Sequence, residues 1–169
     1  SILIRPEFKR DCFDVPIGTF ADEKGTGVPK NCPTGTYQDE TGATSCKDCS
    51  AGFYTSNTGS TSCTPASKGH FVPNAKASTQ IECAKGSKQP STGQSSCPLC
   101  QPGKYASEKG SEQCTLCAEN TYNPNPGSEF CRLCCLEYPS CYFSESGASD
   151  CLRDYSKECR IDFCADFFT

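Results

Sequence analysis

The stretch CPTGTYQDETGATSCKD, residues 32–48, decides the fold, because its pattern returns every 17 residues along the chain. The following stretch, CSAGFYTSNTGSTSCTP at residues 49–65, keeps the two cysteines, both glycines and an aromatic residue at the same offsets. Counting the first cysteine as position 1, cysteine stands at positions 1 and 15, glycine at positions 4 and 11, and tyrosine or lysine at position 6. A repeat this short cannot bury a core of its own, so its units must stack on one another.

The 17-residue period predicts seven modules over residues 15–133, which begin at residues 15, 32, 49, 66, 83, 100 and 117 and are called modules 1 to 7. Modules 1 and 4 lack both cysteines, with Val15 and Pro29 in module 1 and Ala66 and Gln80 in module 4 at those positions. No module carries just one cysteine. Because the two cysteines are lost together, we predict that they pair within a module.

The predicted disulfides are Cys32–Cys46, Cys49–Cys63, Cys83–Cys97, Cys100–Cys114 and Cys117–Cys131. Each closes a loop of 15 residues, which contributes about 3 kcal/mol by the chain-entropy argument. Within a module we expect a short extended segment after the first cysteine, a turn, and a return segment such as residues 43–46 that ends on the second cysteine. The result is a hairpin-like loop, with its aromatic residue on the disulfide of a neighbouring module.

The alternative to disulfide bonding is that these cysteine thiols bind zinc. Cys97, Cys100, Cys114 and Cys117 follow a C-x2-C-x13-C-x2-C spacing, close to that of a four-cysteine zinc site. If the cysteines bound zinc, both members of a C-x2-C pair should be present or absent together. Module 4 contradicts this, because its missing cysteines leave two such pairs with only one cysteine each. The sequence therefore favours structural disulfides and predicts neither a metal nor another cofactor.

Composition indicates the compartment. Seventeen of 169 residues are cysteine, a density typical of disulfide scaffolds in an oxidising environment, so we expect an extracellular protein, secreted or on the cell surface. The net charge of −4 comes without a basic cluster, which argues against nucleic acid as a partner. No apolar run approaches the ~20 residues of a membrane span. Serine and threonine are abundant, which is compatible with O-linked glycans.

The pattern from Cys32-Pro33-Thr34-Gly35-Thr36-Tyr37 to Cys46-Lys47-Asp48-Cys49 resembles the cysteine-rich modules of ephrin-receptor-like repeats. It is also similar to the single-disulfide submodule of tumour necrosis factor receptor ectodomains. The resemblance covers about residues 15–134 and implies an elongated extracellular rod with little regular secondary structure. Tumour necrosis factor receptors alternate one- and two-disulfide submodules, whereas this chain repeats one kind, which weakens the inference to a trimeric cytokine ligand.

Both ends depart from the repeat. The N-terminal segment, residues 1–14, contains an apolar run, and the C-terminal segment, residues 134–169, is predicted to be a compact cysteine-rich domain. Candidate assembly contacts at the two ends are Ile2, Leu3, Ile4, Phe167 and Phe168. The six C-terminal cysteines, whose pairing the sequence leaves open, are Cys134, Cys135, Cys141, Cys151, Cys159 and Cys164.

The cysteine count is odd, so one thiol is free or bonds to another chain. Cys12 stands alone near the N-terminal end, and a bond from Cys12 to the C-terminal segment of the next copy would give a head-to-tail filament. The alternative is that Cys12 bonds within its own chain and another cysteine is left over.

The sequence gives little support to an enzymatic function. His70 is the single histidine, and no Ser-His-Asp or Cys-His arrangement can be built from it among paired cysteines. Two functions remain. The chain is either a structural subunit of an extracellular filament, coat or surface appendage, which associates end to end, or a receptor or adhesion ectodomain that binds a protein ligand along its modules.

Overall fold

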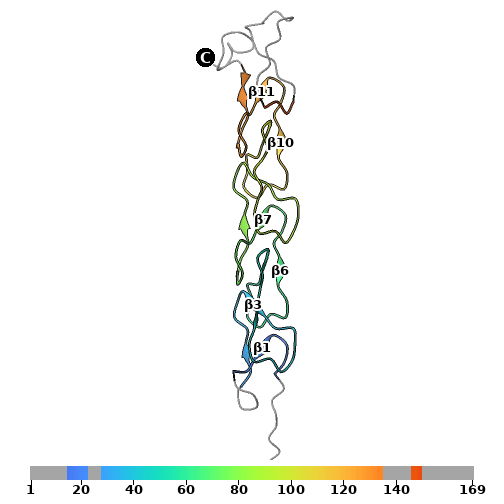
Figure 1. The fold of residues 1–169 in the computed structure, drawn as a ribbon, viewed down its shortest axis with the longest axis vertical. Helices are drawn as coiled ribbons and strands as arrows, with labels where there is room; N and C mark the ends of the chain where they lie inside the picture. The colour runs from blue at the N-terminus through green and yellow to red at the C-terminus, as the bar shows by residue number, and fades with distance from the viewer. Residues whose placement is uncertain (1–14, 23–27, 135–145, 150–169) are drawn as a thin grey trace, which may run out of the picture.

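The computed structural model describes residues 15–22, 28–134 and 146–149, which form a rod of stacked modules (Figure 1). The modules follow one another along the long axis in chain order, from blue at one end to orange at the other (Figure 1). Regular secondary structure in the described residues consists of two-residue β-strands. The predicted fold class, a small disulfide-rich protein built as a tandem array of hairpin-like modules, is confirmed.

Six of the seven modules contain one two-stranded antiparallel sheet, formed by positions 5–6 and 16–17. The pairs are β1 (Thr19–Phe20) with β2 (Lys30–Asn31), β3 (Thr36–Tyr37) with β4 (Lys47–Asp48), β5 (Phe53–Tyr54) with β6 (Thr64–Pro65), β7 (His70–Phe71) with β8 (Ile81–Glu82), β9 (Lys104–Tyr105) with β10 (Thr115–Leu116), and β11 (Thr121–Tyr122) with β12 (Arg132–Leu133).

The return strand lies after the second cysteine of each module. In module 2, Tyr37 pairs with Lys47 and Thr36 with Asp48, so the expected return segment at residues 43–46 is corrected. The reason is that the turn faces its neighbours: the Gln38 N–H donates to Ser60 of module 3, and the Ala43 carbonyl accepts from module 1.

Module 5 lacks a sheet because of one proline. Ser87 and Leu99 form an isolated antiparallel bridge, and the Lys88 N–H donates to the Pro98 carbonyl at 3.0 Å. Pro98 has no N–H to return that bond, so the pairing stops at a single bridge.

Backbone hydrogen bonds join each module to the next. Between modules 2 and 3, the Gly35 N–H donates to Thr55 at 2.9 Å and the Gly59 N–H donates to Cys32 at 2.8 Å. Bonds between the same positions recur from module to module along the rod. Because main-chain groups carry this ladder, the stacking tolerates changes of side chain that leave the glycines in place.

The core is a narrow column instead of a compact interior. Position 1 is fully buried in modules 2 to 7, whether cysteine or alanine, and position 7 is buried in every module. Each module therefore has a small interior that is completed by its neighbours, as expected for a quasi-one-dimensional repeat protein.

Candidate functional site

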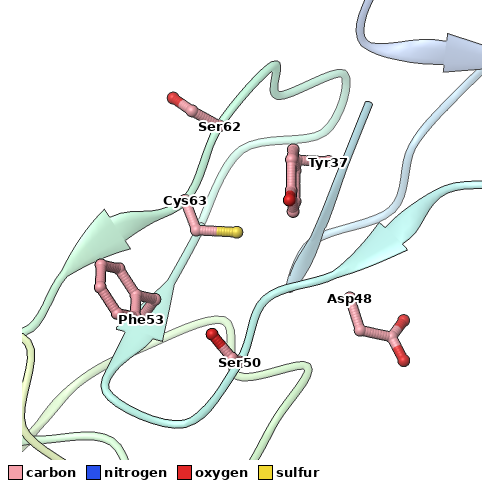
Figure 2. Close-up of a pocket in the computed structure, with 6 residues that line it drawn as sticks. All are labelled: Tyr37, Asp48, Ser50, Phe53, Ser62 and Cys63. Atoms are coloured by element: carbon pink, nitrogen blue, oxygen red, sulfur yellow. The ribbon is translucent and has the colours of Figure 1, made fainter. Parts of the chain in front are cut away.

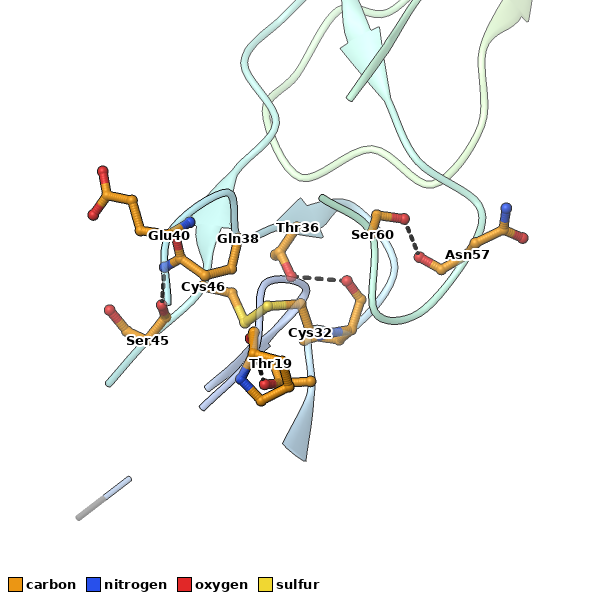
Figure 3. Close-up of a disulfide and its surroundings, with 11 residues drawn as sticks. Thr19, Cys32, Thr36, Gln38, Glu40, Ser45, Cys46, Asn57 and Ser60 are labelled. Atoms are coloured by element: carbon orange, nitrogen blue, oxygen red, sulfur yellow. Dashed lines mark hydrogen bonds between the residues drawn. A yellow bond between two sulfur atoms is a disulfide. The ribbon is translucent and has the colours of Figure 1, made fainter. Parts of the chain in front are cut away.

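One disulfide staples each of modules 2, 3, 5, 6 and 7, and Figure 3 shows the one in module 2. These disulfides join Cys32 to Cys46, Cys49 to Cys63, Cys83 to Cys97, Cys100 to Cys114 and Cys117 to Cys131, with Cα–Cα distances of 5.7–5.8 Å. The four cysteines of the zinc-like spacing are all consumed in these bonds. In the described residues no group of three or more histidine, cysteine or acidic side chains is placed to hold a metal ion.

Buried amides at position 7 brace the turns of modules 2 and 5. In module 2 the Gln38 Nε2 donates to the Ser45 carbonyl at 2.7 Å, and the Gln38 Oε1 accepts from the Glu40 N–H at 3.0 Å (Figure 3). Gln89 makes the equivalent bonds in module 5. A buried amide with both ends satisfied fixes one turn conformation.

The glycines at position 4 touch the module two further along the rod. Gly69 has a left-handed φ of 72°, and a Cβ added to it would meet the backbone carbonyl of Gly110 well inside 3.0 Å, the closest approach of real Cβ atoms. The same relation joins Gly35 to Lys76. Glycine at position 4 is therefore required both by conformation and by close approach of another backbone.

Module 4 closes without a disulfide. Ala66 occupies the buried position of the first cysteine, and the Gln80 Oε1, from the position of the second, accepts the Ser67 N–H at 2.7 Å. Val72 fills position 7 and is fully buried. The role of Gln80 was not predicted from the sequence, although a hydrogen-bonding side chain at a vacant cysteine position is a signal for it.

A hollow of about 260 Å³ opens between modules 2 and 3 (Figure 2). Its lining residues are Tyr37, Asp48, Ser50, Phe53, Ser62 and Cys63. The Tyr37 side chain stands beside Cys63 of the next module, as expected for the module aromatic, but it is only half-buried. The hollow therefore lies over a module boundary and exposes aromatic and polar groups together.

Large apolar side chains are exposed along the sides of the rod. Those at least 48% exposed are Ile17, Val28, Ile81, Leu99, Leu116 and Phe130, four of them in modules 4 to 7. Leu99 and Leu116 occupy position 17; Leu99 lies near Gly127, two modules on, and Leu116 lies near Gly147, beyond module 7. These side chains expose apolar surface on the sides of the rod.

Surface charges are paired locally. The Lys47 Nζ lies 2.7 Å from the Asp39 Oδ1 and 2.9 Å from the Glu40 Oε1. The hydrogen bond from Lys47 lowers the pKa of Asp39, and the bonds to Asp39 and then Glu40 raise the pKa of Lys47. All three groups are exposed, so the cluster shapes the local surface and contributes little to stability.

Most terminal candidates lie outside the described residues. These are Cys12, Ile2, Leu3, Ile4, Phe167, Phe168, Cys135, Cys141, Cys151, Cys159 and Cys164. Cys134 is described, is almost fully buried and is disulfide-bonded. The described part of the chain contains no helix long and apolar enough to cross a membrane.

Residues 18–65 match the family model described as tyrosine-protein kinase ephrin type A/B receptor-like. This stretch of the chain is similar to ephrin-receptor-like cysteine-rich modules. The match runs from position 4 of module 1 to the end of module 3. Modules 5 to 7 repeat the same disulfide, and modules 4, 6 and 7 repeat the same strand pairing. No curated protein matches the chain. Ephrin-receptor-like modules fit an extracellular domain and suggest an interaction or receptor-like role.

Proposed function

We propose that this chain is an extracellular structural and interaction protein, a disulfide-stapled rod that joins a filament, coat or surface appendage through end-to-end association of its copies. The observation that carries the proposal is the ladder of backbone bonds, which runs from Gly18 in module 1 to Ala148 beyond module 7. Each module makes its backbone contacts with the next two modules along the rod, so the modules add along one axis and produce an elongated subunit.

The odd cysteine count supports a covalent link between copies. The five ladder disulfides use ten of the 17 cysteines, and Cys134 is bonded to one of the other six, so the odd thiol lies among the last five. Cys12 near one end and the cysteine-rich segment at the other give such a link a direction. A head-to-tail link of this kind that does not close into a ring produces a filament.

We propose further that the chain is not an enzyme. His70 lies in β7, where its Nδ1 is 3.0 Å from the Lys68 carbonyl oxygen, with no nucleophile or carboxylate bonded to it in the described residues. The hollow between modules 2 and 3 is open and contains one carboxylate, that of Asp48, which is a poor setting for acid–base chemistry.

The second candidate is a receptor or adhesion ectodomain that binds a protein ligand along its modules. Two observations favour it: the family match, and the exposed apolar side chains such as Leu99 and Leu116 on the sides of the rod. Apolar groups exposed on successive modules would give a ligand a repeating surface to contact.

Light scattering of the intact chain over a concentration series separates the two candidates. End-to-end association predicts a molar mass that rises with concentration in steps of 18.2 kDa, together with elongated particles in electron micrographs. A constant mass of 18.2 kDa at every concentration would remove self-association and leave the ligand-binding candidate.

A further inference from the structure

The stacking ladder continues beyond module 7 with a shift of three residues. In modules 2 to 7 the N–H of position 11 donates to the carbonyl of position 1 in the preceding module, as from Gly127 to Cys100. A strict repeat would make Ser144 the next donor, to the carbonyl of Cys117. The bond to Cys117 comes from Gly147 instead. Gly147 thus occupies position 11 of a further module.

Two other contacts show the same shift. The N–H of position 7 donates to position 12 of the next module, whereas Asn123 donates to Ala148, three residues beyond the place that a strict repeat gives. The glycine at position 4 faces position 11 two modules on, and Gly103 faces Gly147, again three residues beyond that place. Three independent contacts therefore agree that a module beginning at Cys134 has three extra residues before its position 11.

The register identifies the partner of Cys134. In every stapled module the second cysteine follows the position 11 residue by four residues, as Cys131 follows Gly127, and the residue four after Gly147 is Cys151. Cys134 is buried and disulfide-bonded like the other cysteines at position 1. We propose that Cys134 pairs with Cys151, which lies outside the described residues, and that Cys134 and residues 146–149 belong to an eighth module. The uninterrupted 17-residue period places the second cysteine of this module at Ala148 instead of Cys151, so the period alone does not reveal the module.

The bond forms by ordinary oxidative chemistry. The Cys134 and Cys151 thiols together lose two protons and two electrons as their sulfur atoms join, and a thiol–disulfide oxidoreductase accepts both electrons as its own disulfide becomes a dithiol. The pairing leaves five cysteines outside the six disulfides, namely Cys12, Cys135, Cys141, Cys159 and Cys164. Five is still odd, so the unpaired thiol belongs to this smaller set.

The eighth module is also the last that can stack in this way. Position 4 of module 7 is Asn120, with a φ of 62°, where modules 1 to 6 have glycine. A ninth module would bring a backbone carbonyl onto the Cβ of Asn120, as Gly147 approaches Gly103. If copies associate end to end as proposed above, the contact between them is therefore not a continuation of the ladder.

Disulfide mapping of the intact, unreduced chain tests the eighth module. Trypsin with a glutamate-specific protease cuts after Arg132, Glu137, Glu145 and Arg153, which separates Cys134 and Cys135 from Cys141 and from Cys151. We expect residues 133–137 to be joined to residues 146–153 and to separate on reduction. Because Cys135 shares the first peptide, the Cys135→Ser variant must keep the link and the Cys134→Ser variant must lose it.

Two further variants give a matched comparison. Cys151→Ser should add a reactive thiol at Cys134, and Cys159→Ser should leave Cys134 bonded. A peptide that joins Cys134 to any cysteine other than Cys151, or a Cys135→Ser chain without the link, would overturn the proposal. The mapping reports a bond within one chain, so its result is independent of whether copies associate.

Discussion

In the module that lacks cysteines, the Gln80 Oε1 lies 2.7 Å from the Ser67 nitrogen and accepts its hydrogen bond. Gln80 occupies the position of the second cysteine, and Ser67 follows Ala66, which occupies that of the first. A polar contact thus closes module 4 at the point where a covalent bond closes its neighbours. The backbone path is kept, since the ladder bonds of module 4 match those of the stapled modules.

The first prediction is that Ala66→Cys combined with Gln80→Cys creates a sixth ladder disulfide. The stapled modules hold these positions 5.7–5.8 Å apart between Cα atoms, a normal disulfide spacing. Closing the 15-residue loop contributes about 3 kcal/mol, and losing the Gln80 bond costs about 1 kcal/mol, so we expect a net gain of about 2 kcal/mol. Hydrogen exchange at residues 66–82 measures the gain. Two additional free thiols in the folded variant would show that module 4 departs from its neighbours.

The second prediction separates the two demands on glycine. In Gly69→Ala the alanine must adopt a left-handed φ, and its Cβ collides with the Gly110 carbonyl. In Gly42→Ala the alanine must adopt the same φ, but no atom beyond its chain neighbours lies within 4 Å of its Cβ. We expect Gly42→Ala to cost about 1 kcal/mol and Gly69→Ala to cost about 1–3 kcal/mol more. Urea unfolding of the two variants gives the difference. Equal losses would mean that modules 4 and 6 do not touch in solution.

The third prediction concerns Lys76, which has a φ of 61° where the other modules have glycine at position 11. Lys76→Gly should stabilise the chain by relieving a left-handed conformation worth about 1 kcal/mol. Lys76 also pairs with Asp48 at 3.4 Å, an exposed contact worth about 0–1 kcal/mol. The Lys76→Ala variant loses this contact without relieving the backbone, so it is the control. Lys76→Gly should be about 1 kcal/mol more stable than Lys76→Ala in urea unfolding, and the reverse order would exclude backbone strain at Lys76.

The fourth prediction is that the loss of one staple stays local. Cys100→Ala with Cys114→Gln copies into module 6 the pair of residues that module 4 carries. We expect a loss of about 2 kcal/mol for module 6 and its contacts, because each module touches only nearby modules. Hydrogen exchange should rise near residues 100–116 and stay unchanged in modules 1 to 3. A uniform rise along the whole rod would contradict local stacking.

The repeat and the closure of its modules could be read from the sequence. The cysteines recur every 17 residues. Both cysteines of module 4 are absent together, at Ala66 and Gln80, which indicates that the two cysteines of a module pair with each other. The contact between Gly69 and Gly110 could not be read in the same way, because it joins modules that are not neighbours in the chain. The recurrence of glycine at position 4 indicates that glycine is needed there. It does not reveal which part of the chain packs against that glycine.

The limits of a fixed period appear most clearly at the eighth module. Three residues inserted after Cys134 move its expected partner from Ala148 to Cys151, and a strict 17-residue count cannot follow that shift. The backbone bonds of Gly147 and Ala148 do follow it, because they depend on position in space. The predicted boundary of a separate C-terminal domain at residue 134 stays a prediction.

The central claim, that the rod associates through its ends, is tested most directly by electrophoresis of the native chain with and without reductant, beside a Cys12→Ser variant. The account predicts a series of multimers of the 18.2 kDa chain that collapses to monomer on reduction and is absent from Cys12→Ser. A single 18.2 kDa species without reductant, the same for native chain and variant, would contradict it.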